Sequence, residues 1–171
     1  MVTLCGFTIL VFFLAIQRLF ELFISNRNEL WIREQGGYEL FPEHYQQMVF
    51  LHISWFVAML IEAWSFHGVP NFWLQILGIN GFLMGQIFRY LAIKKLGKRW
   101  STRIFVIPNH PLIKSGIYKY FKHPNYLGVI LEIAFIPLIY SAFATSIIWS
   151  IANIFILRHR IRLEEKVLKG N

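Results

Sequence analysis

Hydrophobic and polar residues follow one another along this chain in long blocks. Five apolar runs are separated by polar segments, and a membrane-spanning helix needs about 20 predominantly apolar residues. The runs are residues 3–24, 48–66, 72–93, 126–139 and 143–157. This pattern predicts an all-α integral membrane protein with about five transmembrane helices.

The fourth apolar run is short for a full span and contains Pro137. We expect it to form a helical hairpin with the fifth run, turning near residues 140–144. The third run contains Gly81 and Gly85, which are four residues apart. Small residues at this spacing let helix backbones approach closely, so the pair predicts a helix-packing face. A tight turn is expected at 67–71, between the second and third runs.

Composition supports the membrane interpretation. The 171 residues suit one domain; 56% are hydrophobic and 15% are charged, against about 25% charged in a typical soluble domain. The net charge of +8 could indicate nucleic acid, but aromatic and basic residues do not interleave on a polar surface. Anionic lipid headgroups are the expected counterpart. The single cysteine, Cys5, rules out an internal disulfide and a zinc site made of several cysteines.

Positive charge divides the polar segments into two sets. Nearly all lysines and arginines fall in or beside residues 26–46, residues 94–122 and the C-terminus, whereas the intervening connections carry none. The positive-inside rule then predicts an N-terminus outside and a C-terminus in the cytoplasm. We expect a single domain, with three transmembrane helices in 1–93, a cytoplasmic connector at 94–125, and a hairpin with a C-terminal motif at 126–171.

Two polar clusters are predicted at this cytoplasmic end. Pro124 suits the first turn of a helix because it lacks an N–H that would stay unpaired there, so the fourth helix would begin beside His123. The roughly 20 residues that precede Glu164 in the fifth helix cover about 30 Å, close to the hydrocarbon thickness. Arg160 and Glu164 would therefore emerge beside His123 and form a pocket with the connector.

Each polar residue also has a simpler interpretation. Arg160 and Glu164 are four residues apart and could form an ordinary helical ion pair, and His123 could lie at the membrane interface. Other residues could face lipid headgroups or form an interfacial aromatic belt: Lys114, Lys119, Lys122, Trp100, Tyr118 and Tyr120. The histidines show no metal-binding spacing such as HExxH, and no phosphate loop or GxGxxG is present.

Charged residues inside the apolar runs need a separate explanation. Arg18 and Glu21 are three residues apart and could pair with each other. Glu62 and Glu132 stand in apolar runs, where a central charge costs about 2.5–3.5 kcal/mol on insertion scales. We expect them to face the bundle interior or to lie near an edge. The residues alone leave their roles open.

Two motifs resemble those of a known family. "HPLIKSGIYKYFKHPNYLG", residues 110–128, resembles the H-x-L-x-x-x-G-x-Y-x-x-x-(R/K)-H-P-x-Y-x-G signature of the isoprenylcysteine carboxyl methyltransferase family. "RIRLEEKVL", residues 160–168, is similar to that family's R-I-x-x-E-E-x-x-L segment. Lys122 stands where the family often has arginine, and Pro111 is a second departure. The short length and residues 96–108 resemble the small bacterial members, which implies a bacterial cytoplasmic membrane.

The resemblance implies an integral membrane O-methyltransferase that uses S-adenosylmethionine. Its cofactor would lie between the connector and the ends of the last helices, and Arg160 would position the substrate. The implied cofactor-binding residues are His110, Pro111, Leu112, Ile113, Tyr118, His123, Pro124, Asn125, Tyr126 and Glu164. The acceptor would be lipophilic, either an isoprenylcysteine-like carboxylate or a polyketide or alkylpyrone-type lipid.

Two alternatives remain from the sequence. Sterol reductases carry a similar H-P-x-Y-x-G segment and use NADPH, although they are usually longer and have more spans. A non-enzymatic membrane protein, such as a small transporter or an assembly factor, would need no small-molecule pocket. The sequence does not identify the methyl acceptor or the oligomeric state.

Overall fold

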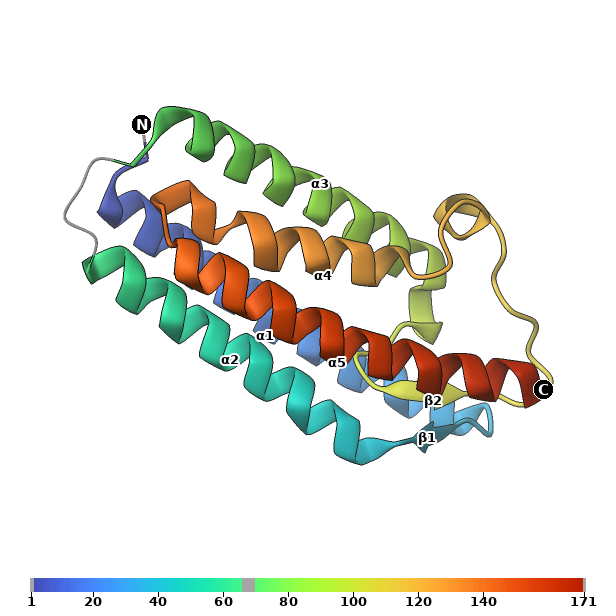
Figure 1. Cartoon of the computed structure of the whole chain (residues 1–171). Coiled ribbons are helices and arrows are strands. Elements are labelled where there is room, and N and C mark those ends of the chain that lie inside the picture. The colour runs from blue at the N-terminus through green and yellow to red at the C-terminus, as the bar shows by residue number, and fades with distance from the viewer. Residues whose placement is uncertain (1, 66–69, 171) are drawn as a thin grey trace.

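The structure is a bundle of long helices (Figure 1), and the computed structural model describes residues 2–65 and 70–170. The helices are α1 (Leu4–Glu34), α2 (Pro42–Ser65), α3 (Phe72–Leu96), α4 (Pro124–Phe135) and α5 (Phe143–Gly170). Among the described residues, α1, α2 and the helix that begins at Phe72 are long and apolar enough to cross a membrane. The predicted helical class is confirmed, while the number of membrane crossings stays a prediction.

The predicted hairpin is formed by α4 and α5. A 3₁₀ turn, Pro137–Tyr140, follows α4, and the left-handed residue Ser141 (φ 58°) reverses the chain before α5 begins. The two helices then run side by side (Figure 1). Most of the tight turn expected at 67–71 lies outside the described residues. Asn71 itself caps α3, because its side-chain oxygen accepts hydrogen bonds from the backbone N–H groups of the first turn.

The ends of the bundle match the division of charge along the sequence. The N-terminus, the start of α3 and the α4–α5 turn lie at one end (Figure 1). The C-terminus and the link between α3 and α4 lie at the other end, which we call the connector end. The lysine- and arginine-rich segments therefore gather at the connector end.

The polar segment 26–46 is not the loop that the apolar pattern suggested. Helix α1 continues to Glu34 because its polar residues bind the connector: Ser25 Oγ accepts from the Thr102 N–H (2.9 Å), and Asn28 Nδ2 donates to the Trp100 carbonyl (2.8 Å). Gly36, with φ 77°, then turns the chain. Strand β1 (Tyr38–Leu40) pairs antiparallel with β2 (Ile104–Val106). These three-residue strands are too short to show an alternating pattern.

Apolar side chains both fill the bundle and cover its outside. Trp55, Met59 and Ile133 are buried in the core. The outer faces of α1, α2, α3 and α5 also carry large exposed apolar residues, among them Phe12, Phe20, Phe50, Trp73 and Phe155. Apolar patches of this extent are rare on soluble monomers and mark surfaces that meet a membrane or a partner. Lipid contact agrees with the length of these helices.

Glycines let α3 and α4 pack closely, as the small-residue spacing predicted. Gly81 and Gly85 are both buried on α3. A Cβ atom at Gly81 would overlap the Phe135 side chain, and one at Gly85 would lie 3.0 Å from the Gly128 carbonyl oxygen. The packing interpretation is confirmed, and Gly128 of the H-P-x-Y-x-G segment belongs to the same contact.

Replacing Gly128 with alanine should destabilise the protein. The new Cβ atom would lie 2.7 Å from the Gly85 carbonyl oxygen and 2.5 Å from Arg89 Cγ, so the helices must separate. We expect a cost of about 1–3 kcal/mol, as for other overpacked sites, measured as a lower thermal midpoint in detergent. Gly36→Ala is unsuitable as a control because of its positive φ. Gly6→Ala on α1 is the matched control, because Gly6 is an exposed helical glycine and its new Cβ atom would lie no closer than 3.3 Å to any neighbour. It should leave the midpoint unchanged or slightly higher, and an unchanged midpoint for Gly128→Ala contradicts the prediction.

Four charged residues form a buried cluster that joins α1, α3 and α4. Arg18 Nη1 bonds Glu21 Oε2 at 2.7 Å, and Arg18 also bonds Glu132. Arg89 bonds Glu21, and its Nε lies 3.4 Å from Glu132 Oε1. The expected Arg18–Glu21 pair is confirmed, and so is the inward position of Glu132. Two positive and two negative charges neutralise one another, as buried charges require.

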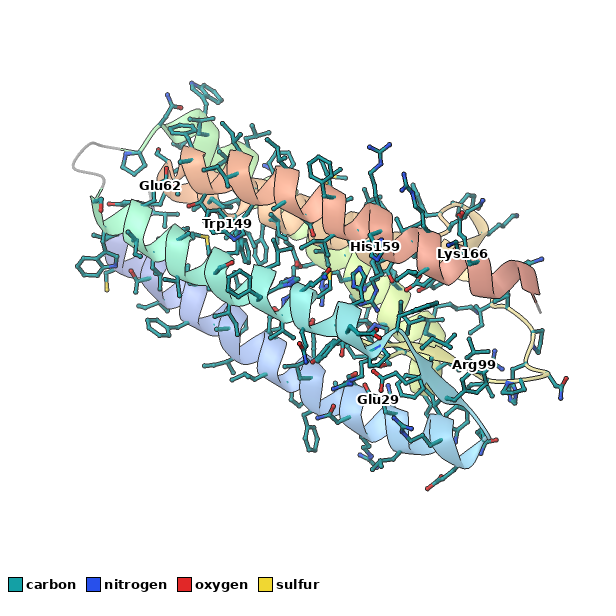
Figure 2. All side chains as sticks on the ribbon, turned by 60° about the horizontal axis from the view of Figure 1, so that its bottom comes forward. Glu29, Glu62, Arg99, Trp149, His159 and Lys166 are labelled. Atoms are coloured by element: carbon teal, nitrogen blue, oxygen red, sulfur yellow. The ribbon has the colours of Figure 1, made fainter. Side chains whose placement is uncertain are left out.

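Glu62 has a different role at the opposite end of the bundle. Its carboxylate accepts hydrogen bonds from the N–H groups of Ala144 (2.8 Å) and Thr145 (2.7 Å) in the first turn of α5. The Thr145 hydroxyl donates to the same carboxylate at 2.7 Å. Figure 2 shows Glu62 at the end of α2, beside the start of α5. A residue of one helix therefore caps another helix, which favours a structural role.

Replacing Glu62 with alanine should destabilise α5. Two N–H groups at the helix start would lose their acceptor, and a lost hydrogen bond to a charged group costs about 1.5–3 kcal/mol. The check is the thermal midpoint in detergent together with protease sensitivity near Phe143. Glu62→Gln keeps one acceptor oxygen and should lose less stability. Equal midpoints for all three proteins would contradict the capping role.

Candidate functional site

A cavity of about 880 Å³ opens among the helices at the connector end. Its walls come from all five helices, α1 to α5, and from the connector, and we call it the main cavity. Its volume falls within the range of about 300–1,000 Å³ that is typical of small-molecule sites. The predicted pocket between the connector and the last helices is therefore present, although α1 and α2 also contribute to it.

The start of α4 forms one wall of the main cavity. Pro124 occupies the first turn of this helix, as predicted. His123 stacks on Tyr126, with ring centroids 5.3 Å apart and planes 11° from parallel. Asn125 also borders the cavity, and its Oδ1 atom is buried without a hydrogen-bond partner among the described residues. Such an atom is available to a ligand, because buried polar groups are normally hydrogen-bonded.

Side chains from both sequence motifs meet across this wall. Arg160 Nε donates to the Tyr126 hydroxyl (2.7 Å) and lies 3.3 Å from Glu164 Oε1. The Tyr126 hydroxyl in turn donates to Glu164, and His123 Nδ1 lies 3.5 Å from Glu164 Oε2. The ordinary Arg160–Glu164 ion pair thus exists but is part of a larger cluster. We call Tyr126, Arg160 and Glu164 the motif cluster.

The connector holds the motif cluster from the other side. Arg160 Nη2 donates to the backbone carbonyl of Thr102 at 2.8 Å. Thr102 is itself tied to Ser25 of α1 through its N–H and its hydroxyl. The Arg160 side chain is almost fully buried. Its direction is therefore set by contacts with α4 and the connector rather than by α5 alone.

Tyr118 borders the main cavity from the connector. Burial raises the pKa of its phenol to about 12, and the nearby negative charge of Glu164 adds to the effect. A raised pKa favours the protonated form of a phenol, so Tyr118 stays neutral near pH 7. It presents a hydroxyl donor and an aromatic face to the cavity.

The structure brings together most of the predicted site residues. Eight of them border the main cavity: Leu112, Ile113, Tyr118, His123, Asn125, Tyr126, Arg160 and Glu164. Three others do not. His110 is exposed, with Nδ1 3.3 Å from the Pro108 carbonyl, and Pro111 uses its carbonyl to accept from Arg99 (2.9 Å). Pro124 is buried at the helix start, where it shapes the backbone.

Other residues on the cavity wall were missed by sequence analysis. Trp100 borders the cavity, and its buried Nε1 donor has no partner among the described residues. Arg103 lies over the Tyr45 ring at 4.3 Å and bonds Glu39 at 2.8 Å. Trp100 is only an interfacial aromatic in the sequence pattern, and Arg103 is only one of many basic residues. Their positions follow from the β1–β2 pairing, which no motif indicates.

Comparison with known proteins confirms the resemblance carried by the two motifs. Residues 76–170 match the sequence model of the Isoprenylcysteine carboxyl methyltransferase (ICMT) family. The chain belongs to this family. The matched region contains α4, α5 and nearly all of α3 with the connector, and therefore the whole motif cluster.

Relatives extend the similarity to the first two helices. The chain is 40% identical to the uncharacterized protein YpbQ of Bacillus subtilis, over 95% of this chain and 96% of that protein. It is 26% identical to the protein-S-isoprenylcysteine O-methyltransferase of Tribolium castaneum, over 73% of this chain and 46% of that protein. It is 24% identical to protein-S-isoprenylcysteine O-methyltransferase B of Arabidopsis thaliana, over 54% of this chain and 47% of that protein.

The chain thus spans about half the length of the two methyltransferases from Tribolium and Arabidopsis. It spans nearly the whole length of the Bacillus protein. No solved structure gives a significant match to the chain.

Proposed function

We propose that this protein is an S-adenosylmethionine-dependent O-methyltransferase that acts on a lipophilic acceptor in the membrane. The observation that carries the proposal is the motif cluster, which joins both family motifs on the wall of one cavity. Membership of the ICMT family and the named activity of its relatives support the reaction type.

The residues around the main cavity fit this cofactor. Glu164 can accept hydrogen bonds from ribose hydroxyls or from an ammonium group, and Asn125 offers a buried, unpartnered oxygen. At the start of α4 the Tyr126 N–H already donates to the His123 carbonyl, which leaves the Asn125 N–H to donate to a carboxylate. Tyr118 and His123 have rings that can stack on a base or attract a cation. When bound, S-adenosylmethionine supplies a methyl group on a positively charged sulfur.

Arg160 is the residue proposed to position the acceptor. Its guanidinium is a planar fork that suits an anionic oxygen, and the Tyr126 hydroxyl and the Thr102 carbonyl fix its direction. Methyl transfer is a single displacement, so alignment of the attacking oxygen dominates the rate. A carboxylate acceptor needs no general base. The positive charge of Arg160 would lower the pKa of an enol and favour its reactive anion.

The walls of the main cavity beyond the motif cluster support a lipophilic acceptor. Leu19 and Leu22 of α1 and Met48, Ile53 and Phe56 of α2 border the cavity, which therefore offers apolar surface to a hydrocarbon chain. We propose that the connector end faces the cytoplasm of a bacterial cell, because it carries most of the positive charge. The acceptor would then enter from the bilayer around α1 and α2.

Calorimetry on the detergent-purified protein tests the proposed cofactor. We expect S-adenosylmethionine and S-adenosylhomocysteine to bind and NADPH not to bind. Binding of NADPH alone would favour a reductase. If none of the three compounds binds, a non-enzymatic protein is favoured. Transfer of a labelled methyl group to extracted membrane lipids, followed by mass spectrometry, would then identify the acceptor.

A further inference from the structure

The main cavity continues past the motif cluster toward the middle of the bundle. On α2, it is bordered by residues of one helix face: Tyr45, Met48, Val49, His52, Ile53 and Phe56. On α1, Arg18, Leu19 and Leu22 face it in the same way. Most of these residues are apolar, but Arg18 and His52 are not. We call the part of the cavity around them the polar end.

The depth of the polar end can be measured along three helices. His44 of α2 stacks on His159, the neighbour of Arg160 (ring centroids 5.1 Å; Figure 2 labels His159). His52 lies eight residues further along α2, or about 12 Å at 1.5 Å per residue. Glu132, which bonds Arg18, is six residues beyond Tyr126 on α4, or about 9 Å.

Helix α1 agrees with this depth. Ser25 accepts a hydrogen bond from Thr102, whose carbonyl binds Arg160. Arg18 precedes Ser25 by seven residues, or about 10 Å. The polar end therefore lies about 10 Å from Arg160, with the apolar side chains of Leu22, Met48 and Val49 bordering the cavity between them.

His52 presents a hydrogen-bond acceptor at the polar end. Its Nδ1 atom lies 2.8 Å from the Met48 carbonyl oxygen. Because a carbonyl can only accept, Nδ1 must carry the proton, which leaves Nε2 of the neutral ring as an acceptor. None of the described residues donates to Nε2. Its natural ligand is thus a donor such as a hydroxyl group.

The charges around His52 do not favour binding of a negatively charged group at the polar end. Arg18 and Arg89 are both paired with Glu21 and Glu132, so the cluster is neutral overall. A neutral polar group fits this end better than a charged one, because an added charge would lack a free partner. A purely hydrocarbon chain would instead leave Nε2 desolvated and unpaired.

We propose that the lipophilic acceptor carries a hydroxyl group on its chain, about 10 Å from the oxygen that Arg160 positions, and that His52 selects for it. The inference rests on the proposed function and narrows it. The preferred acceptor is an oxygenated chain, such as a hydroxylated long-chain acid or polyketide, rather than an unmodified isoprenoid. His52 determines specificity and takes no part in methyl transfer.

Stearic acid and 10-hydroxystearic acid are a matched pair of probes, since they differ only in a hydroxyl group in mid-chain. Their binding to the protein loaded with S-adenosylhomocysteine is measured by calorimetry in detergent. We expect the hydroxy acid to bind about tenfold more tightly, as one hydrogen bond allows. The ratio of the two Kd values should fall to about one in His52→Leu. It should recover in part in His52→Gln, whose amide oxygen is an acceptor. Ile61→Leu, on the exposed face of α2, is the control.

The outcomes separate this inference from the proposed function. Equal binding of the two acids to the wild-type protein, or binding of neither, overturns the inference while leaving the cofactor site intact. A preference that survives in His52→Leu overturns the role of His52. Failure to bind S-adenosylhomocysteine overturns the proposed function and this inference with it. If the leucine variant does not fold, the binding of the two acids to the wild-type protein still tests the inference.

Discussion

Replacing Glu164 with glutamine should weaken S-adenosylhomocysteine binding by about 10- to 100-fold. The change removes a negative charge that accepts from Tyr126 and lies beside Arg160 and His123. Hydrogen bonds to charged groups are worth about 1.5–3 kcal/mol, and each 1.4 kcal/mol corresponds to a tenfold change in Kd. Calorimetry on the detergent-purified protein measures the change directly.

A matched control for this variant is Glu34→Gln at the exposed end of α1. It makes the same chemical change at the connector end, away from the cavity, and should leave the Kd within about twofold, as expected for surface changes of up to about 0.5 kcal/mol. Unchanged affinity in Glu164→Gln would show that this carboxylate does not contact the cofactor. An equal loss in both variants would point to a general effect of net charge.

Replacing Arg160 with alanine should reduce methyl transfer by about 100- to 1,000-fold, the range found when one stabilising donor is removed from an active site. Binding of S-adenosylhomocysteine should change far less than turnover, because Arg160 is proposed to hold the acceptor. The measurement is the transfer of a labelled methyl group to extracted membrane lipids, with calorimetry on the same preparation.

Two further variants make the Arg160 test specific. Arg160→Lys keeps the positive charge but loses the planar fork, so it should recover only part of the activity. Arg158→Ala removes a positive charge from an exposed position on the same helix and should leave turnover close to that of the wild type. If Arg160→Ala and Glu164→Gln both leave methylation intact, the motif cluster is not the active site.

Much of the cavity wall around the motif cluster was predictable, because the positions of its residues follow from their spacing within single segments of the sequence. Pro124 indicates a helix start, and the four-residue separation of Arg160 and Glu164 places them on one helix face. The helix length from Phe143 then brings that face to the connector end. The structure places Tyr126 between the two residues, which follows once α4 and α5 form a hairpin.

The acceptor side could not be predicted in the same way. From the sequence, Arg18 was considered only as a partner of Glu21 and His52 was not singled out, and neither residue belongs to a recognised motif. Their position on the wall of the main cavity depends on how α1 and α2 sit against α4. The angles at which helices cross are set by side-chain packing over many residues. No short segment of the sequence therefore indicates which residues of α1 and α2 face the cavity.

By itself, the sequence determined the helical class, the hairpin, the gathering of positive charge at one end and the family. Each of these follows from local composition or from spacing within one segment. Only the tertiary structure decided that Glu62 caps a helix 82 residues away, that Thr102 orients Arg160, and that His52 borders the main cavity. These contacts join segments far apart in the chain, and their geometry arises only when the helices pack.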